Sequence, residues 1–309
     1  METPEPKSQS SSSSPMPPSS LARQWRIAAQ RNLRNQWSKM ASNRQQWLSS
    51  SSSARTHATS LVNAYLSQKY MPLMELGALK DMPDIRNKAS FKLFEQQELH
   101  RSKVLSSYKD MVCNCYDFTK CILLDFLQVA VVMHMVDASK SVRSFLKVAS
   151  SSSLVQFSSS SKDINDTGDC GGIAVFRFWS ISPFEKLAEE LSQMFKLELS
   201  LKRFLLLELL SIGCEVSQVN RLCWSDELYP GEFSDLKVCN LYSEETSEPV
   251  HPRLKDCKFD MPAFQCNRHP DHEILQVYIT TWLAEVNIDG HRVDEIFAVI
   301  GEEMHISLS

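Results

Sequence analysis

At 309 residues, the chain is long enough for one large domain or two of ordinary size, and 43% hydrophobic residues suffice for a sizeable core. Only eight glycines are present, which argues against a β-rich fold with many turns and against a glycine-lined nucleotide site. The net charge is −4, but residues 7–69 hold nine basic residues and no acid, whereas the chain from Glu75 onward holds 24 basic and 35 acidic residues. A polycationic arm therefore precedes an acidic body.

The cysteines and the apolar runs bear on the cellular compartment. Nine cysteines occur in a chain whose opening, METPEPKSQ, lacks the apolar segment of a secretory signal. An odd number of cysteines without export is typical of reduced thiols, so we expect a nuclear or cytoplasmic protein. We predict no transmembrane segment, because no run reaches the ~18 apolar residues that one needs. The nearest, Cys121 to Val136, is interrupted by Asp125, Gln128 and His134.

The first 58 residues divide into two segments. Residues 1–20 are rich in serine and proline and are predicted to be a disordered tail, because nothing in them can bury apolar surface. Residues 21–58 alternate basic and aromatic residues, and their apolar side chains fall on one face of a helix. The candidate binding residues of this basic amphipathic arm are Arg23, Trp25, Arg26, Arg31, Arg34, Trp37, Arg44 and Trp47.

Four interpretations of the arm are open. Its arginines could neutralise the phosphates of a nucleic acid while its tryptophans stack on exposed bases. The helix could instead lie on a membrane surface or bind in the groove of a partner protein. An arginine- and serine-rich, acid-poor segment also describes the transit peptide of an organelle-imported enzyme, although Glu2 and Glu5 argue against one. Finally, the tryptophan face could dock on the protein's own body. Docking on protein, its own or another, is the favoured interpretation.

Residues 59–148 are predicted to form a helical module. The five-serine segment Ser49–Ser53, near the end of the arm, is predicted to be a spacer between the helical pattern of the arm and that of the module. Met71-Pro72 marks a helix boundary, because proline disfavours a helical conformation in the residue before it. A long amphipathic pattern begins at Asp84. No β-type alternation appears, so the block reads as an antiparallel helical hairpin or the start of a bundle.

The segment 111–136 within this module is nearly continuously apolar and contains three cysteines, Cys113, Cys115 and Cys121. Their spacing differs from that of common zinc sites, and a fourth ligand would have to come from elsewhere. We therefore interpret the cysteines as small apolar residues. Two interpretations of the segment are open, a fully buried helix and a segment that is absent from some forms of the protein.

A serine-rich linker, residues 149–172, is predicted to join this module to a leucine-rich helical module at residues 173–309. The densest apolar run lies near the start of the second module and reads as a pair of helices. Ser182 caps the first helix, Ser200 caps the second, and Gly213 ends it. The second of these helices is apolar nearly all round and is therefore predicted to be buried.

Two more helices are predicted near the end of the chain, one with Pro270 at its first position and a last one ending at Gly301. Residue types that could bind zinc tetrahedrally precede and overlap the first of them, namely Cys257, Cys266, His269 and His272. Their spacing is not that of the familiar zinc fingers, so ordinary loop residues are the simpler interpretation. A zinc-stabilised binding module is the alternative, and no other cofactor is predicted.

Signatures of enzymes are otherwise absent: the sequence contains no P-loop, G-x-G-x-x-G, G-x-S-x-G or H-E-x-x-H motif. We therefore predict a mostly α protein with two helical modules, a disordered tail and a serine-rich linker. The expected function is that of a non-enzymatic adaptor or scaffold subunit of a nuclear multi-protein assembly. Its leucine-rich helices would bind other proteins, and its basic arm would contact nucleic acid or an acidic partner.

Overall fold

The computed structural model of the protein describes residues 19–148, 174–213, 222–243, 248–250 and 270–308. This part of the chain contains six α-helices and one two-stranded sheet, which confirms the predicted mostly helical fold. None of the described helices is long and apolar enough to cross a membrane. The predicted linker, 149–172, and all but the last two residues of the predicted tail lie outside the described residues.

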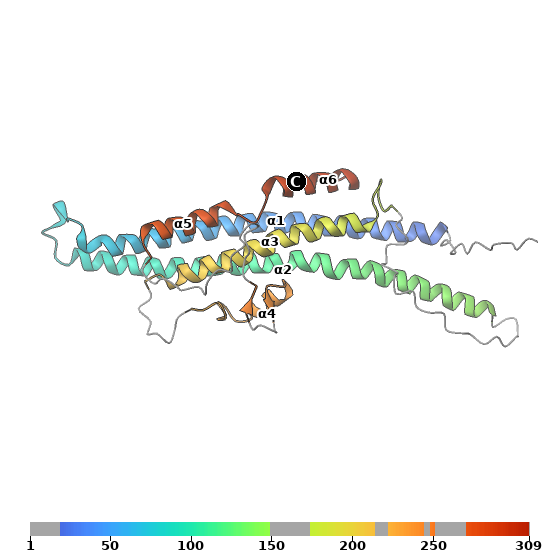
Figure 1. Cartoon of the computed structure of the whole chain (residues 1–309), viewed down its shortest axis with the longest axis horizontal. Helices are drawn as coiled ribbons and strands as arrows, with labels where there is room; N and C mark the ends of the chain where they lie inside the picture. Colours follow the sequence, from blue (N-terminus) through green and yellow to red (C-terminus); the bar gives the residue numbers. More distant parts are fainter. Residues whose placement is uncertain (1–18, 149–173, 214–221, 244–247, 251–269, 309) are drawn as a thin grey trace, which may run out of the picture.

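Two long helices form the frame of the molecule. α1, Ser19–Tyr70, and α2, Ile85–Val148, contain 52 and 64 residues. They run antiparallel and side by side along the longest dimension of the protein (Figure 1). The 3-10 turns Met71–Leu73 and Gly77–Leu79 connect them. The predicted helix boundary at Pro72 is confirmed, and α2 begins one residue after its predicted start.

The buried sides of α1 and α2 follow a heptad spacing, in which steps of four and three residues alternate. In α1 these positions are Leu33, Trp37, Met40, Arg44, Trp47, Ser51, Ala54, Ala58, Leu61 and Tyr65, and all but Arg44 are buried. In α2 they are Gln97, Arg101, Val104, Tyr108, Met111, Cys115 and Phe118, all buried. This spacing keeps one face of each helix buried over many turns.

The five-serine segment Ser49–Ser53 is not a spacer, because it lies inside α1. Ser51 occupies a heptad position and is buried. Its hydroxyl donates a hydrogen bond to Glu285 Oε1 at 2.6 Å, and its carbonyl oxygen accepts one from Trp282 Nε1 at 3.3 Å. Contacts with the C-terminal part of the chain thus outweigh the modest helix propensity of serine. The arm predicted at 21–58 is therefore continuous with the helix that follows it.

The predicted pair of helices after the linker is one helix, α3, Ile181–Ser211. Ser200 is not an N-cap. It is buried in mid-helix, and its hydroxyl donates to the carbonyl oxygen of Val250 at 2.7 Å. The residue before the helix is Ser180, two positions ahead of the predicted cap. Gly213 follows the end of the helix with φ +67°, a conformation that glycine adopts without strain, as predicted.

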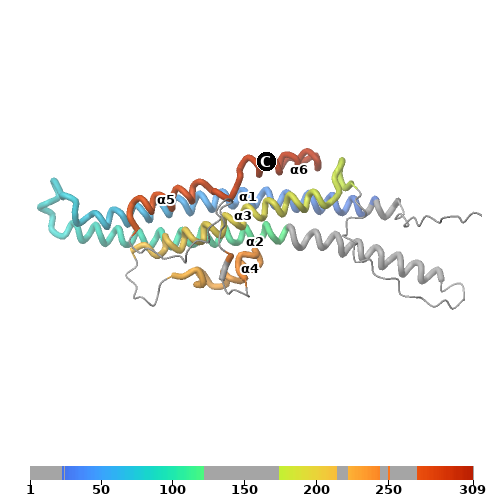
Figure 2. The backbone as a smooth tube through the Cα atoms, in the orientation of Figure 1, coloured from blue at the N-terminus to red at the C-terminus, as the bar shows by residue number. Residues whose placement is uncertain are grey.

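The remaining elements cover the long pair. α4, Glu232–Val238, packs against α2, whereas α5, His272–Ala284, and α6, Gly290–Met304, pack against α1 (Figure 2). The short strands β1, Tyr242–Ser243, and β2, Glu248–Pro249, pair antiparallel.

Both C-terminal helices begin or end differently from the prediction. α5 starts at His272, after Asp271 as its N-cap residue, so Pro270 lies just outside the helix. α6 passes through Gly301 and ends at Met304. Gly301 is required there for a different reason: a Cβ at this position would lie 2.8 Å from the carbonyl oxygen of Ile306, where the chain turns back over the helix.

One hydrophobic core runs through the described part of the chain. It includes Trp37 and Leu61 from α1, Met111 from α2, Leu199 from α3 and Ile300 from α6. The segments predicted as arm, first module and second module therefore share a core instead of forming separate ones.

Candidate binding surface and buried ionic centres

The tryptophans of the predicted arm are core residues. Trp25, Trp37 and Trp47 have exposed fractions of 4%, 0% and 1%. Trp37 meets Phe297 of α6 edge to face with ring centroids 5.9 Å apart, and Trp47 meets Phe195 of α3 in the same way at 5.2 Å. The tryptophan face thus packs on the protein's own body, one of the four interpretations. In this conformation none of the three indoles is available to stack on a nucleotide base.

The arginines of the arm fall into two groups. Arg34 donates to the carbonyl oxygen of Met304 at 3.2 Å, and Arg44 forms an ion pair with Asp294 at 2.5 Å, so both help to attach α6. Arg23, Arg26 and Arg31 are exposed, and the structure records no hydrogen bond or ion pair from them to other described residues. Only these three are left for a partner.

The three arginines share their surface with an exposed apolar side chain. Arg23, Ile27 and Arg31 follow one another at four-residue spacing and lie on one side of α1, with Arg26 beside them. The side chain of Ile27 is 61% exposed. We call Arg23, Arg26, Ile27 and Arg31 the basic face. It extends over about 12 Å of helix, and the segment that carries it contains no acidic residue.

Exposed apolar side chains also gather where α1 and α2 are joined. We call this surface the hairpin end. Its most exposed member is Leu73, at 82%, and the set is Leu73, Met74, Leu79, Met82, Phe91 and Phe94. The leucines of α3, by contrast, are taken up by the core: Leu199, Leu206 and Leu209 are fully buried. The leucine-rich helix therefore uses its apolar side chains internally.

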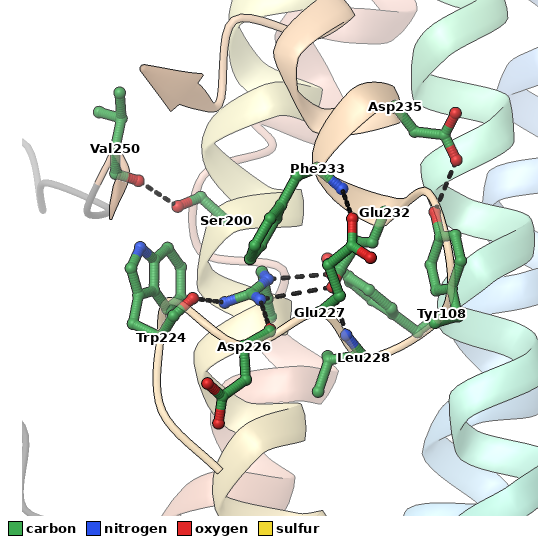
Figure 3. Close-up of polar contacts among 12 residues, drawn as sticks. Tyr108, Ser200, Trp224, Asp226, Glu227, Leu228, Glu232, Phe233, Asp235 and Val250 are labelled. Atoms are coloured by element: carbon green, nitrogen blue, oxygen red, sulfur yellow. Dashed lines mark hydrogen bonds and ion pairs between the residues drawn. The ribbon is translucent and has the colours of Figure 1, made fainter. Parts of the chain in front are cut away.

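A buried ionic centre forms around Arg203 of α3. Figure 3 labels its partners Trp224, Asp226 and Glu232. Its Nε donates to Glu232 Oε1 at 2.9 Å, and both partners are at most 1% exposed. The other guanidinium nitrogens donate to the carbonyl oxygens of Trp224 at 2.7 Å and Asp226 at 2.6 Å. The guanidinium also lies over the Trp224 ring, 4.6 Å from its centroid. One arginine thus fixes the loop before α4 and the start of α4 itself.

Glu232 extends this centre to α2. Its carboxylate accepts the hydroxyl of Tyr108 at 3.0 Å and the backbone N–H of Leu228 at 2.7 Å. Burial, followed by the negative charge of Glu232, raises the pKa of the Tyr108 hydroxyl well above its ordinary value. The tyrosine therefore stays a hydrogen-bond donor at neutral pH.

A second buried centre surrounds Lys202, the residue before Arg203. Its Nζ lies 3.1 Å from Glu198 Oε1 and 3.5 Å from Glu285 Oε1, and it donates to the carbonyl oxygen of Trp282 at 3.1 Å. Glu198 Oε2 accepts the backbone and side-chain N–H groups of Asn287, both at 3.1 Å. This centre fixes the connection between α5 and α6 on α3.

The chemistry of both centres is that of attachment. Lys202 and Arg203 donate hydrogen bonds to carboxylates and backbone carbonyl oxygens. Buried charges need such partners to offset the free-energy cost of their desolvation. Helical periodicity in the sequence does not predict either of the two buried ionic centres. A signal was present: charged residues inside a helix that is otherwise apolar all round have to find partners within the fold.

Three of the four predicted zinc ligands lie outside the described residues. Cys257, Cys266 and His269 lie outside the described residues, and His272 is the exposed first residue of α5. Among the described residues, no group of three or more histidine, cysteine, aspartate or glutamate side chains could hold a metal ion. The zinc module and the transit peptide remain predictions.

The three cysteines of α2 divide by exposure. Cys115 and Cys121 are buried, as interpreted from the sequence, whereas Cys113 is exposed.

Comparisons with known proteins identify no relative: no protein family, no curated protein and no solved structure matches this chain.

Proposed function

We propose that the protein is a non-enzymatic adaptor or scaffold subunit of a nuclear multi-protein assembly, whose basic face binds an acidic segment of a partner protein. The observation that carries this proposal is that α1 has both a buried aromatic side and exposed arginines. Its tryptophans anchor one side in the core, and Arg23, Arg26 and Arg31 point outward without a partner among the described residues. Because the backbone of this helix is already ordered, little backbone conformational entropy is lost when its exposed arginines bind a ligand.

An acidic protein segment fits the basic face better than a nucleic acid does. Sequence-tolerant binding of single strands relies on aromatic stacking as well as on phosphate contacts, and the tryptophans nearest these arginines are buried. Ile27 adds an exposed apolar contact between the charges. A helix that combines arginines with an apolar residue suits the acidic, partly apolar surface of a protein.

The hairpin end supplies a second contact in this proposal. The six apolar side chains that define it are exposed at the connection between the two longest helices, well separated along α1 from the basic face. Surfaces of this kind commonly mark protein–protein contacts. A subunit with two separate binding surfaces on a long frame can hold two components of an assembly together.

The experiment is affinity purification of the tagged full-length protein, with identification of its partners. The test variant is R23E/R26E/R31E. The control, K103E/K120E/K186E, reverses three exposed lysines of α2 and α3 and so changes the net charge equally. We expect partners rich in acidic segments to be lost from the test variant and retained by the control, and their binding to weaken as salt is raised.

Other results would overturn parts of the proposal. If the test variant retains every partner, the basic face is not a binding surface. Loss of the interaction after nuclease treatment shows that nucleic acid is the ligand. Turnover of a small substrate by the purified chain alone contradicts a non-enzymatic role. For the hairpin end, L73D/M82D should release a different set of partners from the set that the arginine variant loses.

A further inference from the structure

α4 lies parallel to α2 and in register with it. The hydrogen bond from the Tyr108 hydroxyl to Glu232 joins residues 124 positions apart. Cys115 and Cys239 are separated by the same number of positions, and an interaction with Cys239 raises the pKa of the Cys115 thiol. Seven residues, or two helical turns, separate Tyr108 from Cys115 in α2, and seven residues also separate Glu232 from Cys239. The two pairs therefore mark the two ends of one α2–α4 interface.

The two cysteines at the far end of this interface are free, buried thiols. Cys115 is 2% exposed and Cys239, the residue after α4, is fully buried. The interaction with Cys239, together with burial, raises the pKa of the Cys115 thiol well above its ordinary value. Cys113, two residues earlier on α2, is exposed and offers a built-in comparison.

We propose that Cys115 and Cys239 form a reversible disulfide that ties the end of α4 to α2 when a small-molecule disulfide, such as oxidised glutathione, acts as the oxidant. The equal spacing from the Tyr108–Glu232 hydrogen bond places the two buried thiols at matching positions of the α2–α4 interface. Disulfides in reducing compartments are usually transient of this kind.

The exchange balances with that oxidant alone. The thiolate of one cysteine attacks a sulfur of the small disulfide, whose S–S bond breaks and releases one thiolate. The second cysteine, after losing its proton, attacks the mixed disulfide on the protein sulfur and releases the other small thiolate. Two protein thiols are oxidised to one disulfide, and one small disulfide is reduced to two thiols.

Burial decides the rate of the reaction. Neither sulfur is accessible while α4 is in place, and the raised pKa leaves little thiolate at neutral pH. Oxidation therefore requires transient opening of α4, a seven-residue helix held to α2 at its other end by the hydrogen bond between Tyr108 and Glu232. The disulfide should be slow to form and, once formed, protected from reductant by the same burial.

The test uses the full-length reduced protein. Brief alkylation with iodoacetamide should label Cys113 about tenfold or more faster than Cys115 and Cys239. Incubation with oxidised glutathione, followed by non-reducing peptide mapping, should yield a peptide that joins Cys115 to Cys239. In Y108F, which loses one hydrogen bond of the interface, the link should form about fivefold faster.

Two variants complete the design. C113S should form the link at the wild-type rate, and C239S should instead retain glutathione on Cys115 when α4 opens. The proposal fails if no Cys115–Cys239 peptide appears in either the wild type or Y108F after long incubation. It also fails if the dominant intramolecular link contains Cys113, or if glutathione stays bound to Cys115 in the wild type.

Discussion

Positive charge has two different positions in this protein. It is exposed on the basic face of α1, and it is buried at the two consecutive basic residues of α3. Arg23, Arg26 and Arg31 are exposed on the first turns of α1, whereas its tryptophans are buried. Lys202 and Arg203 lie within the buried circumference of α3, with exposed fractions of 0% and 1%. Both helices mix basic and apolar residues, so position relative to the buried side, and not composition, separates a surface from a structural anchor.

The energetic consequences of the two arrangements are opposite. A buried guanidinium is stable only while its carboxylate and carbonyl partners remain in place, so removing one partner leaves an uncompensated charge. An exposed guanidinium is already solvated and loses little when it is changed. The charges of α3 should therefore dominate folding, and those of α1 should matter only when a partner is present.

The largest effect is expected at the Arg203 centre. R203M leaves the buried carboxylate of Glu232 unpaired and removes the donors to the carbonyl oxygens of Trp224 and Asp226. The free energy of unfolding should fall by about 3–5 kcal/mol, measured by urea denaturation followed by circular dichroism. The control K92M breaks the exposed Lys92–Glu95 pair and should cost below about 0.5 kcal/mol.

A double variant separates charge burial from packing at the same place. R203M/E232L removes both charges, so it should recover part of the stability that R203M loses. Recovery should be incomplete, because Tyr108 and the backbone N–H of Leu228 lose the acceptor that Glu232 provides. If the double variant is no more stable than R203M, the unpaired carboxylate is not the cause of the loss.

Local sequence patterns predicted the elements better than they predicted how those elements are joined. The end of α1 near Pro72 and the glycine stop at Gly213 follow from backbone geometry within a few residues, and both are confirmed. The serines failed as signals. Ser51 and Ser200 were interpreted as a spacer and a cap, but both are buried in helices with partners far along the chain, Glu285 and Val250.

The candidate site shows the same limit. Helical spacing placed Trp37 and Trp47 on one face correctly, but it could not show whether that face meets a ligand or the protein's own α3 and α6. The ion pairs of Lys202 and Arg203 depend on Glu285 and Glu232, which lie in other elements. A short window of sequence contains Lys202 and its neighbour Glu198, four positions earlier in α3, but neither Glu285 nor Glu232, so only the fold identifies these distant partners.

An intermediate effect is expected from Tyr108 at alkaline pH. Its folded-state pKa is raised above the ordinary value of 10.0. Above pH 10 the unfolded chain therefore releases this proton while the folded chain keeps it. Stability conferred by the protonated hydroxyl is complete below pH 10 and is lost as pH rises further, by at most about 1.4 kcal/mol per pH unit.

The variant Y108F tests this assignment. It should cost about 1 kcal/mol at neutral pH, because Glu232 loses one donor. Its unfolding free energy should then decline less steeply than that of the wild type above pH 10, measured by urea denaturation at several pH values. Parallel alkaline declines in the two proteins would assign the loss to other groups, of which Tyr229, whose pKa is also raised by burial, is the first to examine.

The smallest effect on folding is expected from the basic face. R23E/R26E/R31E should change the free energy of unfolding by within about 1 kcal/mol and leave the helical circular dichroism unchanged, because these side chains are exposed and bond to no other described residue. W37A, on the buried side of the same helix, should cost about 3–5 kcal/mol. If the arginine variant proves as destabilising as W37A, these arginines hold the fold together, and the contrast between α1 and α3 no longer stands. If it folds normally yet loses its partners, the exposed arginines of α1 serve recognition while the buried residues of the helix hold it in the fold.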